Sequence, residues 1–106
     1  MELMEQICKL TDELEPHMLE IRHQIHERPE LAFHEFETSA LVKRELEWMQ
    51  VPYEESPCRP GIVAVVDSGK PGKLLMLRAD MDALPVQEKT GLPYASKTPG
   101  VMHACG

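Results

Sequence analysis

Apolar residues recur at intervals of three and four over residues 3–27, which predicts a helix with one hydrophobic face. Pro16 interrupts the pattern and leaves two alternatives, a single kinked helix or two closely joined helices. The Arg28-Pro29 step should end the segment, because a residue before proline avoids helical angles. The positions on the apolar face are Leu3, Ile7, Leu10, Leu14, Met18, Ile21 and Ile25.

A second helix is predicted over residues 35–50, and Pro52 forbids its continuation. Its apolar face is formed by Thr38, Leu41, Val42, Leu46 and Met49, while the charged residues between them are placed for solvent.

Strands are predicted in the next part of the chain. Residues 61–66 and 73–79 are apolar runs, and the turn-forming residues 67–72 lie between them, which predicts an antiparallel hairpin. Residues 53–55 are predicted as a short edge strand. Neither long run alternates cleanly, and such strands usually belong to a sheet that is covered on both faces.

From Leu84 to the last residue, frequent proline and glycine predict irregular structure. The whole pattern predicts an α/β fold in which two N-terminal helices pack on a small mixed sheet with a hairpin. We expect this arrangement to be one edge of a larger three-layer α/β/α sandwich, because the second sheet face needs material that these residues do not provide.

Composition and charge narrow the functional class. The 106 residues carry a net charge of −7, which argues against nucleic acid and anionic membranes as partners. We see no apolar signal segment and no run long enough to span a membrane. The three cysteines are widely separated and odd in number, so they do not predict a disulfide framework. These features favour a cytoplasmic protein with reduced thiols.

Two carboxylates, Asp80 and Asp82, directly follow the second apolar run. In an extended segment, residues two positions apart project to the same side. Two carboxylates that lie so close repel each other unless a cation or a proton separates them, which favours a metal or acid–base role. The alternative is that both accept hydrogen bonds from backbone amides of the following turn.

Cys105 and His103 are candidate metal ligands near the end of the sequence. A thiolate is a good ligand for zinc, manganese or nickel, and an extended segment can place His103 on the same face. The alternatives are a small buried cysteine and a structural histidine. We interpret His17, His23, His26 and His34 as residues of exposed helix faces without a functional role.

Several motifs in order carry a family resemblance. They are the Arg22–Glu35 segment, the Gly61–Val65 run, the Leu77–Pro85 segment and the terminal Gly100–Gly106 segment. With these motifs the sequence resembles the metal-dependent amidohydrolases and aminoacylases, which include hippurate hydrolases, N-acetyl-diaminopimelate deacetylases and auxin-conjugate hydrolases. They belong to the wider group of zinc carboxypeptidase-like exopeptidases.

The resemblance implies cleavage of N-acyl or N-aroyl amino acids by a metal-activated water. It implies that Cys105 is a metal ligand and that Asp82 orients another ligand. Asp80 stands where other branches carry a metal-binding histidine. The family's general-base glutamate and remaining ligands lie beyond residue 106. We therefore expect residues 1–106 to be an N-terminal segment of the catalytic domain, without a second domain, that binds a divalent metal incompletely and is inactive alone.

Two alternatives from other classes remain open at the level of sequence. One is a non-catalytic module that self-associates into a homo-oligomer through its uncovered sheet. The other is a small metal-binding protein that uses Cys105 and His103.

Overall fold

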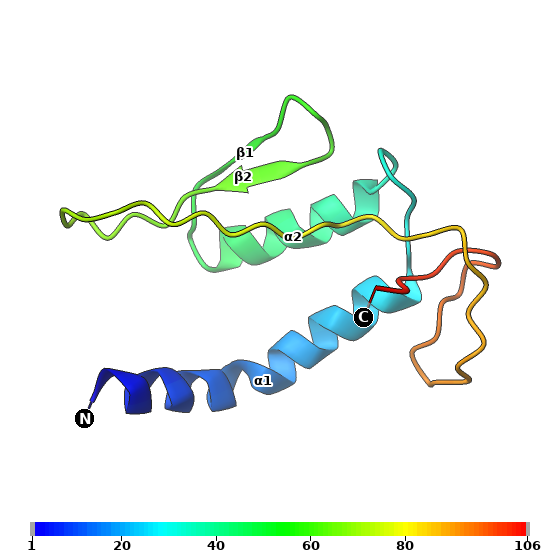
Figure 1. The fold of residues 1–106 in the computed structure, drawn as a ribbon, viewed down its shortest axis with the longest axis horizontal. Coiled ribbons are helices and arrows are strands. Elements are labelled where there is room, and N and C mark those ends of the chain that lie inside the picture. Colours follow the sequence, from blue (N-terminus) through cyan, green and yellow to red (C-terminus); the bar gives the residue numbers. More distant parts are fainter. Residues whose placement is uncertain (1, 106) are drawn as a thin grey trace.

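The computed structural model describes residues 2–105. Two helices, α1 (Leu3–Glu27) and α2 (Phe36–Trp48), precede two short strands, β1 (Tyr53–Glu55) and β2 (Ile62–Ala64). The rest of the described chain is loops and extended segments, and the last of these returns to the C-terminal end of α1 (Figure 1). The predicted α/β class is confirmed.

Helix α1 is continuous, which decides between the two alternatives at Pro16, since that proline lies inside the helix. The backbone amide of Glu2 donates a hydrogen bond to the carboxylate of Glu5 (3.2 Å), which satisfies a free amide just before the helix. The helix ends at Glu27, as the proline at position 29 predicts.

The first turn of helix α2 is capped by the carboxylate of a residue that precedes the helix. Glu30 accepts hydrogen bonds from the backbone amides of Thr38 (2.6 Å) and Glu37 (3.0 Å), and from the Thr38 hydroxyl (2.6 Å). Free amides of the first helical turn need such acceptors, and a negative charge there is also favoured by the helix dipole. The connector before α2 is thus tied to the start of the helix.

Strands β1 and β2 form an antiparallel hairpin in which Tyr53 pairs with Ala64 and Glu55 with Ile62. The short edge strand predicted at residues 53–55 is therefore confirmed. Helix α2 supports the hairpin through the buried hydroxyl of Ser39, which donates to the carbonyl oxygen of Pro60 (2.9 Å). A second tie is the ion pair between Lys43 and Glu55 (2.6 Å).

The hairpin predicted between residues 61–66 and 73–79 is wrong. Residues 62–64 pair instead with the strand before them, across a tight loop closed by the bond from the Ser56 amide to the Gly61 carbonyl (2.8 Å). The sheet of β1 and β2 is antiparallel rather than mixed. Within residues 2–105, parallel pairing occurs only as an isolated bridge between Leu31 and Ala83.

Much apolar surface is uncovered in the described chain. Residues 73–79 run in extended form without a strand partner, and Leu74, Leu75, Met76 and Leu77 are 81–93% exposed. We call residues 74–77 the apolar ribbon. No residue of α1 is buried, and within residues 2–105 the buried apolar residues are Pro29, Pro60 and Ala83. Neither helix in this part of the chain is long and apolar enough to cross a membrane.

Candidate functional site

The segment that carries the two predicted carboxylates is attached to the end of α1. The amide of Ala83 donates to the carbonyl oxygen of Glu30 (2.7 Å), next to the bridge between Leu31 and Ala83. Ala83 is only 3% exposed, so this point of the segment is held firmly. The attachment places Asp82 next to the connector between the two helices.

The structure gives Asp80 and Asp82 different environments. Asp80 is exposed and pairs with Arg78 across 3.0 Å, an interaction that solvent weakens. Asp82 is half-buried. Within residues 2–105, no backbone amide of the following turn donates to either carboxylate, so nothing in the described structure supports the capping alternative. Asp82 is the better placed of the two for a functional role.

A second backbone bridge brings the terminal segment to Asp82. The amides and carbonyls of Leu84 and Met102 bond reciprocally, at 2.9 and 3.0 Å. In this antiparallel register, Ala104 follows the bridge by as many residues as Asp82 precedes it. The bridge thus directs residues 103–105 back along the segment that carries Asp82.

His103 occupies a polar and partly enclosed position. Its Nε2 atom is buried and has no hydrogen-bond partner among the described residues. Burial lowers the pKa of His103 because it removes water from the charged form, and the nearby His26 lowers it further. The carboxylates of Asp82 and Glu30 oppose this decrease in the pKa. The imidazole is therefore biased toward its neutral form, which can accept a proton or bind a metal.

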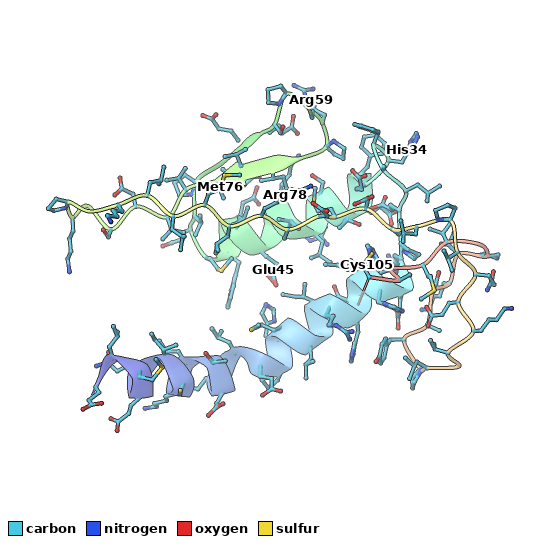
Figure 2. All side chains as sticks on the ribbon, viewed as in Figure 1. His34, Glu45, Arg59, Met76, Arg78 and Cys105 are labelled. Carbon is cyan, nitrogen blue, oxygen red and sulfur yellow. The ribbon has the colours of Figure 1, made fainter. Side chains whose placement is uncertain are left out.

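Cys105 is an exposed free thiol (Figure 2), so the alternative of a small buried cysteine does not hold. Residues 2–105 contain no group of three or more His, Cys, Asp or Glu side chains that could hold a metal ion. The donors in the described chain are too few and too dispersed to form a metal site by themselves. The assignment of Cys105 and His103 as ligands stays a prediction.

Three of the histidines that we interpreted as residues of exposed helix faces have specific partners, so that part of the interpretation is wrong for them. The Nε2 atom of His17 lies 2.5 Å from Oε1 of Glu45. The Nε2 atom of His26 lies 2.8 Å from Oε1 of Glu88, and the two side chains are 13% and 2% exposed. The ring of His23 stacks on Tyr94, with centroids 3.8 Å apart and planes 9° apart. The one available sequence signal was the spacing of three between His23 and His26, which places both rings on one side of α1.

Glu88 lies in the loop that joins the Asp82 segment to residues 102–105, and its carboxylate has three partners. Its carboxylate accepts hydrogen bonds from the Thr90 hydroxyl and from the Ser96 amide (2.9 Å) in addition to its contact with His26. These hydrogen bonds, the one from Thr90 foremost, lower the pKa of Glu88 because they stabilise its charged form. The irregular segment predicted from proline and glycine is thus ordered around one carboxylate.

Acid is expected to loosen this loop only below pH 4.5. The pKa of Glu88 is lowered from its ordinary 4.5, so the unfolded chain takes up the proton at higher pH than the folded chain. The contacts therefore contribute stability above pH 4.5, which is lost as pH falls through the lower folded-state pKa. An NMR titration that follows the Ser96 amide measures this transition. A midpoint at or above pH 4.5 would contradict the expectation.

Comparison with known proteins shows what the chain is similar to. Residues 76–106, which contain Asp80, Asp82, His103 and Cys105, match Peptidase family M20/M25/M40. The whole chain is 47% identical to thermostable carboxypeptidase 1 of Saccharolobus solfataricus and 48% identical to the hippurate hydrolase of Campylobacter jejuni. Through residues 76–106 the chain is similar to the M20 peptidases. The resemblance seen in the sequence is confirmed.

Two solved structures share the fold described above. The YXEP protein of Bacillus subtilis, described as a dinuclear metal-binding peptidase, is 40% identical over 89% of this chain with a TM-score of 0.82. A structure from methicillin-resistant Staphylococcus aureus is 47% identical over 96% of this chain with a TM-score of 0.88. The chain spans 27% of the length of each of these two proteins, and also of the carboxypeptidase and the hippurate hydrolase above.

Proposed function

We propose that this chain supplies the N-terminal part of the catalytic domain of a metal-dependent amidohydrolase. The observation that carries the proposal is the match of the entire chain, at 48% identity, to a hippurate hydrolase. A hippurate hydrolase and a carboxypeptidase have one chemistry in common, since both split an amide whose amine side is an amino acid with a free carboxylate. We therefore propose N-acyl or N-aroyl amino acids as the substrate class.

The proposal gives the residues of the site separate roles. Asp82 is held by the attachment of Ala83 to Glu30, and it would orient a neighbouring group rather than react itself. Cys105 would contribute a thiolate ligand for a zinc, manganese or nickel ion. Since residues 2–105 do not assemble a metal site, the general base and the other ligands would have to come from residues outside this sequence.

The isolated chain is expected to show no hydrolase activity. Purified chain is incubated with N-benzoylglycine and zinc, manganese or nickel, and release of glycine is measured against the same metal without protein. We expect equal rates in both, because the described side chains do not form a metal site. Turnover at about 1 s⁻¹ or faster, which is ordinary for enzymes, would contradict the expectation.

The apolar ribbon supports a second candidate, a module that self-associates. An extended segment with unpaired backbone groups and exposed Leu and Met side chains on both faces is a template for pairing with another strand. The occupant we propose for the isolated chain is a second copy of itself. No observation in the described residues favours the third alternative, a small metal-binding protein.

Charges in the ribbon are expected to convert the isolated chain to a monomer. The variant Leu75→Lys with Leu77→Lys places two charges on one face of the extended segment, where pairing would have to desolvate them. Size-exclusion chromatography with light scattering gives the mass. The control is Ser68→Lys with Gly72→Lys, which adds the same charge outside the ribbon, and Gly72 has open space for a side chain. A wild-type monomer would reject self-association.

A further inference from the structure

We propose that Glu88 and His26 are a positioning pair that fixes residues 102–105 beside Asp82. The pair touches none of the candidate site residues through its own hydrogen bonds, so its role is to align other groups. The inference rests on the proposed function, because it concerns the alignment of that same site.

The first observation is the burial of Glu88. Its side chain is only 2% exposed, and a buried carboxylate is costly unless it is paired and hydrogen-bonded. Here both oxygens have partners, in His26 and the Ser96 amide on one side and the Thr90 hydroxyl on the other. A loop without helix or strand has thus been ordered around a single charge, and that charge is attached to α1.

The second observation is that other contacts attach the same loop to the same end of α1. Tyr94 stacks on His23, and the amide of Lys97 donates to the carbonyl oxygen of Glu27 (2.9 Å). The loop leaves the Asp82 segment at Leu84 and returns to it at Met102, where the two residues pair. If the loop detached from α1, residues 102–105 would be held to the Asp82 segment by this bridge alone.

The third observation is that both parts of the site are attached to the C-terminal end of α1 or to the residues just after it. The connector that follows α1 holds Ala83, and through it Asp82, by the carbonyl of Glu30. The last turn of α1 holds the loop, and through it residues 102–105, by His26. Both parts of the site are therefore positioned against the last turn of α1 and the connector that directly follows it, and a scaffold fixes groups that act together in this way.

The experiment measures geometry in the full chain without any hydrolysis. Cys8 and Cys58 are replaced by serine, a nitroxide is attached to Cys105, and paramagnetic broadening of the Asp82 and Ala83 amides is recorded by NMR. We expect strong broadening in this parent chain. Glu88→Ala should weaken the broadening and speed amide hydrogen exchange of Ser96 about tenfold or more, because that amide loses its acceptor.

Matched variants separate positioning from general stability. Glu88→Gln keeps an oxygen that can accept from the Ser96 amide, so it should retain most of the broadening. Glu54→Gln, which makes the same change on exposed strand β1, should leave the broadening unchanged. His26→Ala should weaken it, while the amide signals of α2 and β2 stay in place.

Two outcomes would overturn the proposal. One is unchanged broadening at Asp82 and Ala83 in both Glu88→Ala and His26→Ala. The other is loss of the α2 and β2 signals together with the broadening, which would show that the pair merely stabilises the chain. Neither depends on hydrolase activity, so failure here is distinct from failure of the proposed function.

Discussion

A chimera in which residues 1–106 replace the matching segment of the Campylobacter jejuni hippurate hydrolase is expected to hydrolyse N-benzoylglycine. The two segments are 48% identical over 106 residues, which is all of this chain and 27% of the relative. The remainder of the hydrolase would then cover the apolar ribbon and the exposed face of α1, which have no partner in the described chain. Glycine release by the purified chimera measures the outcome.

Within that chimera, Asp82→Ala is expected to lower kcat/KM about 10- to 100-fold, the usual cost of removing a group that orients a ligand. Asp80→Ala should have a smaller effect, because Asp80 is exposed and pairs with Arg78 in solvent. The matched control is Asp67→Ala, which removes a carboxylate from an exposed turn and should leave kcat/KM unchanged. A folded chimera with full activity after Asp82→Ala would remove Asp82 from the site.

Local sequence patterns predicted the helices well, because helix formation depends on residues three and four positions apart. The apolar period located α1, and the prolines at positions 29 and 52 marked where each helical segment had to end. The hairpin was predicted wrongly because strand pairing is not local. Residues 61–66 are flanked by two possible partners, and composition favoured the more apolar one over the short strand β1.

In the candidate site, too, the sequence indicated individual residues but not the contacts between residues far apart in the chain. Residue type made Asp82 and Cys105 candidates, since carboxylates and thiolates are metal ligands, and the family resemblance gave them their expected roles. The contact between His26 and Glu88 joins positions 62 residues apart, and neither residue belongs to a recognisable spacing with the other. Sequence reasoning therefore named candidate site residues, whose roles stay predictions, and missed the contact between His26 and Glu88.

The connector before α2 gives the other large effect, which is on stability. Glu30→Ala is expected to lower the free energy of unfolding by about 2 kcal/mol, since it removes the acceptor for the amides of Glu37 and Thr38. Thr38 is only 4% exposed, so water cannot replace the lost bonds fully. Urea unfolding followed by circular dichroism at the helical band measures the change.

Two further variants identify the cause of that loss. Glu30→Gln retains one carbonyl oxygen and should recover part of the stability, with the remainder reflecting the negative charge at the start of the helix. Glu35→Gln removes a nearby charge, leaves the Glu30 bonds intact and keeps an oxygen that can accept from the Phe33 amide, so it serves as the comparison for charge. If Glu30→Ala and Glu35→Gln lowered stability equally, the capping role of Glu30 would be rejected. If the capping role holds, Glu30 stabilises α2 with its side chain and positions Asp82 with its backbone, so a single residue couples the fold to the site.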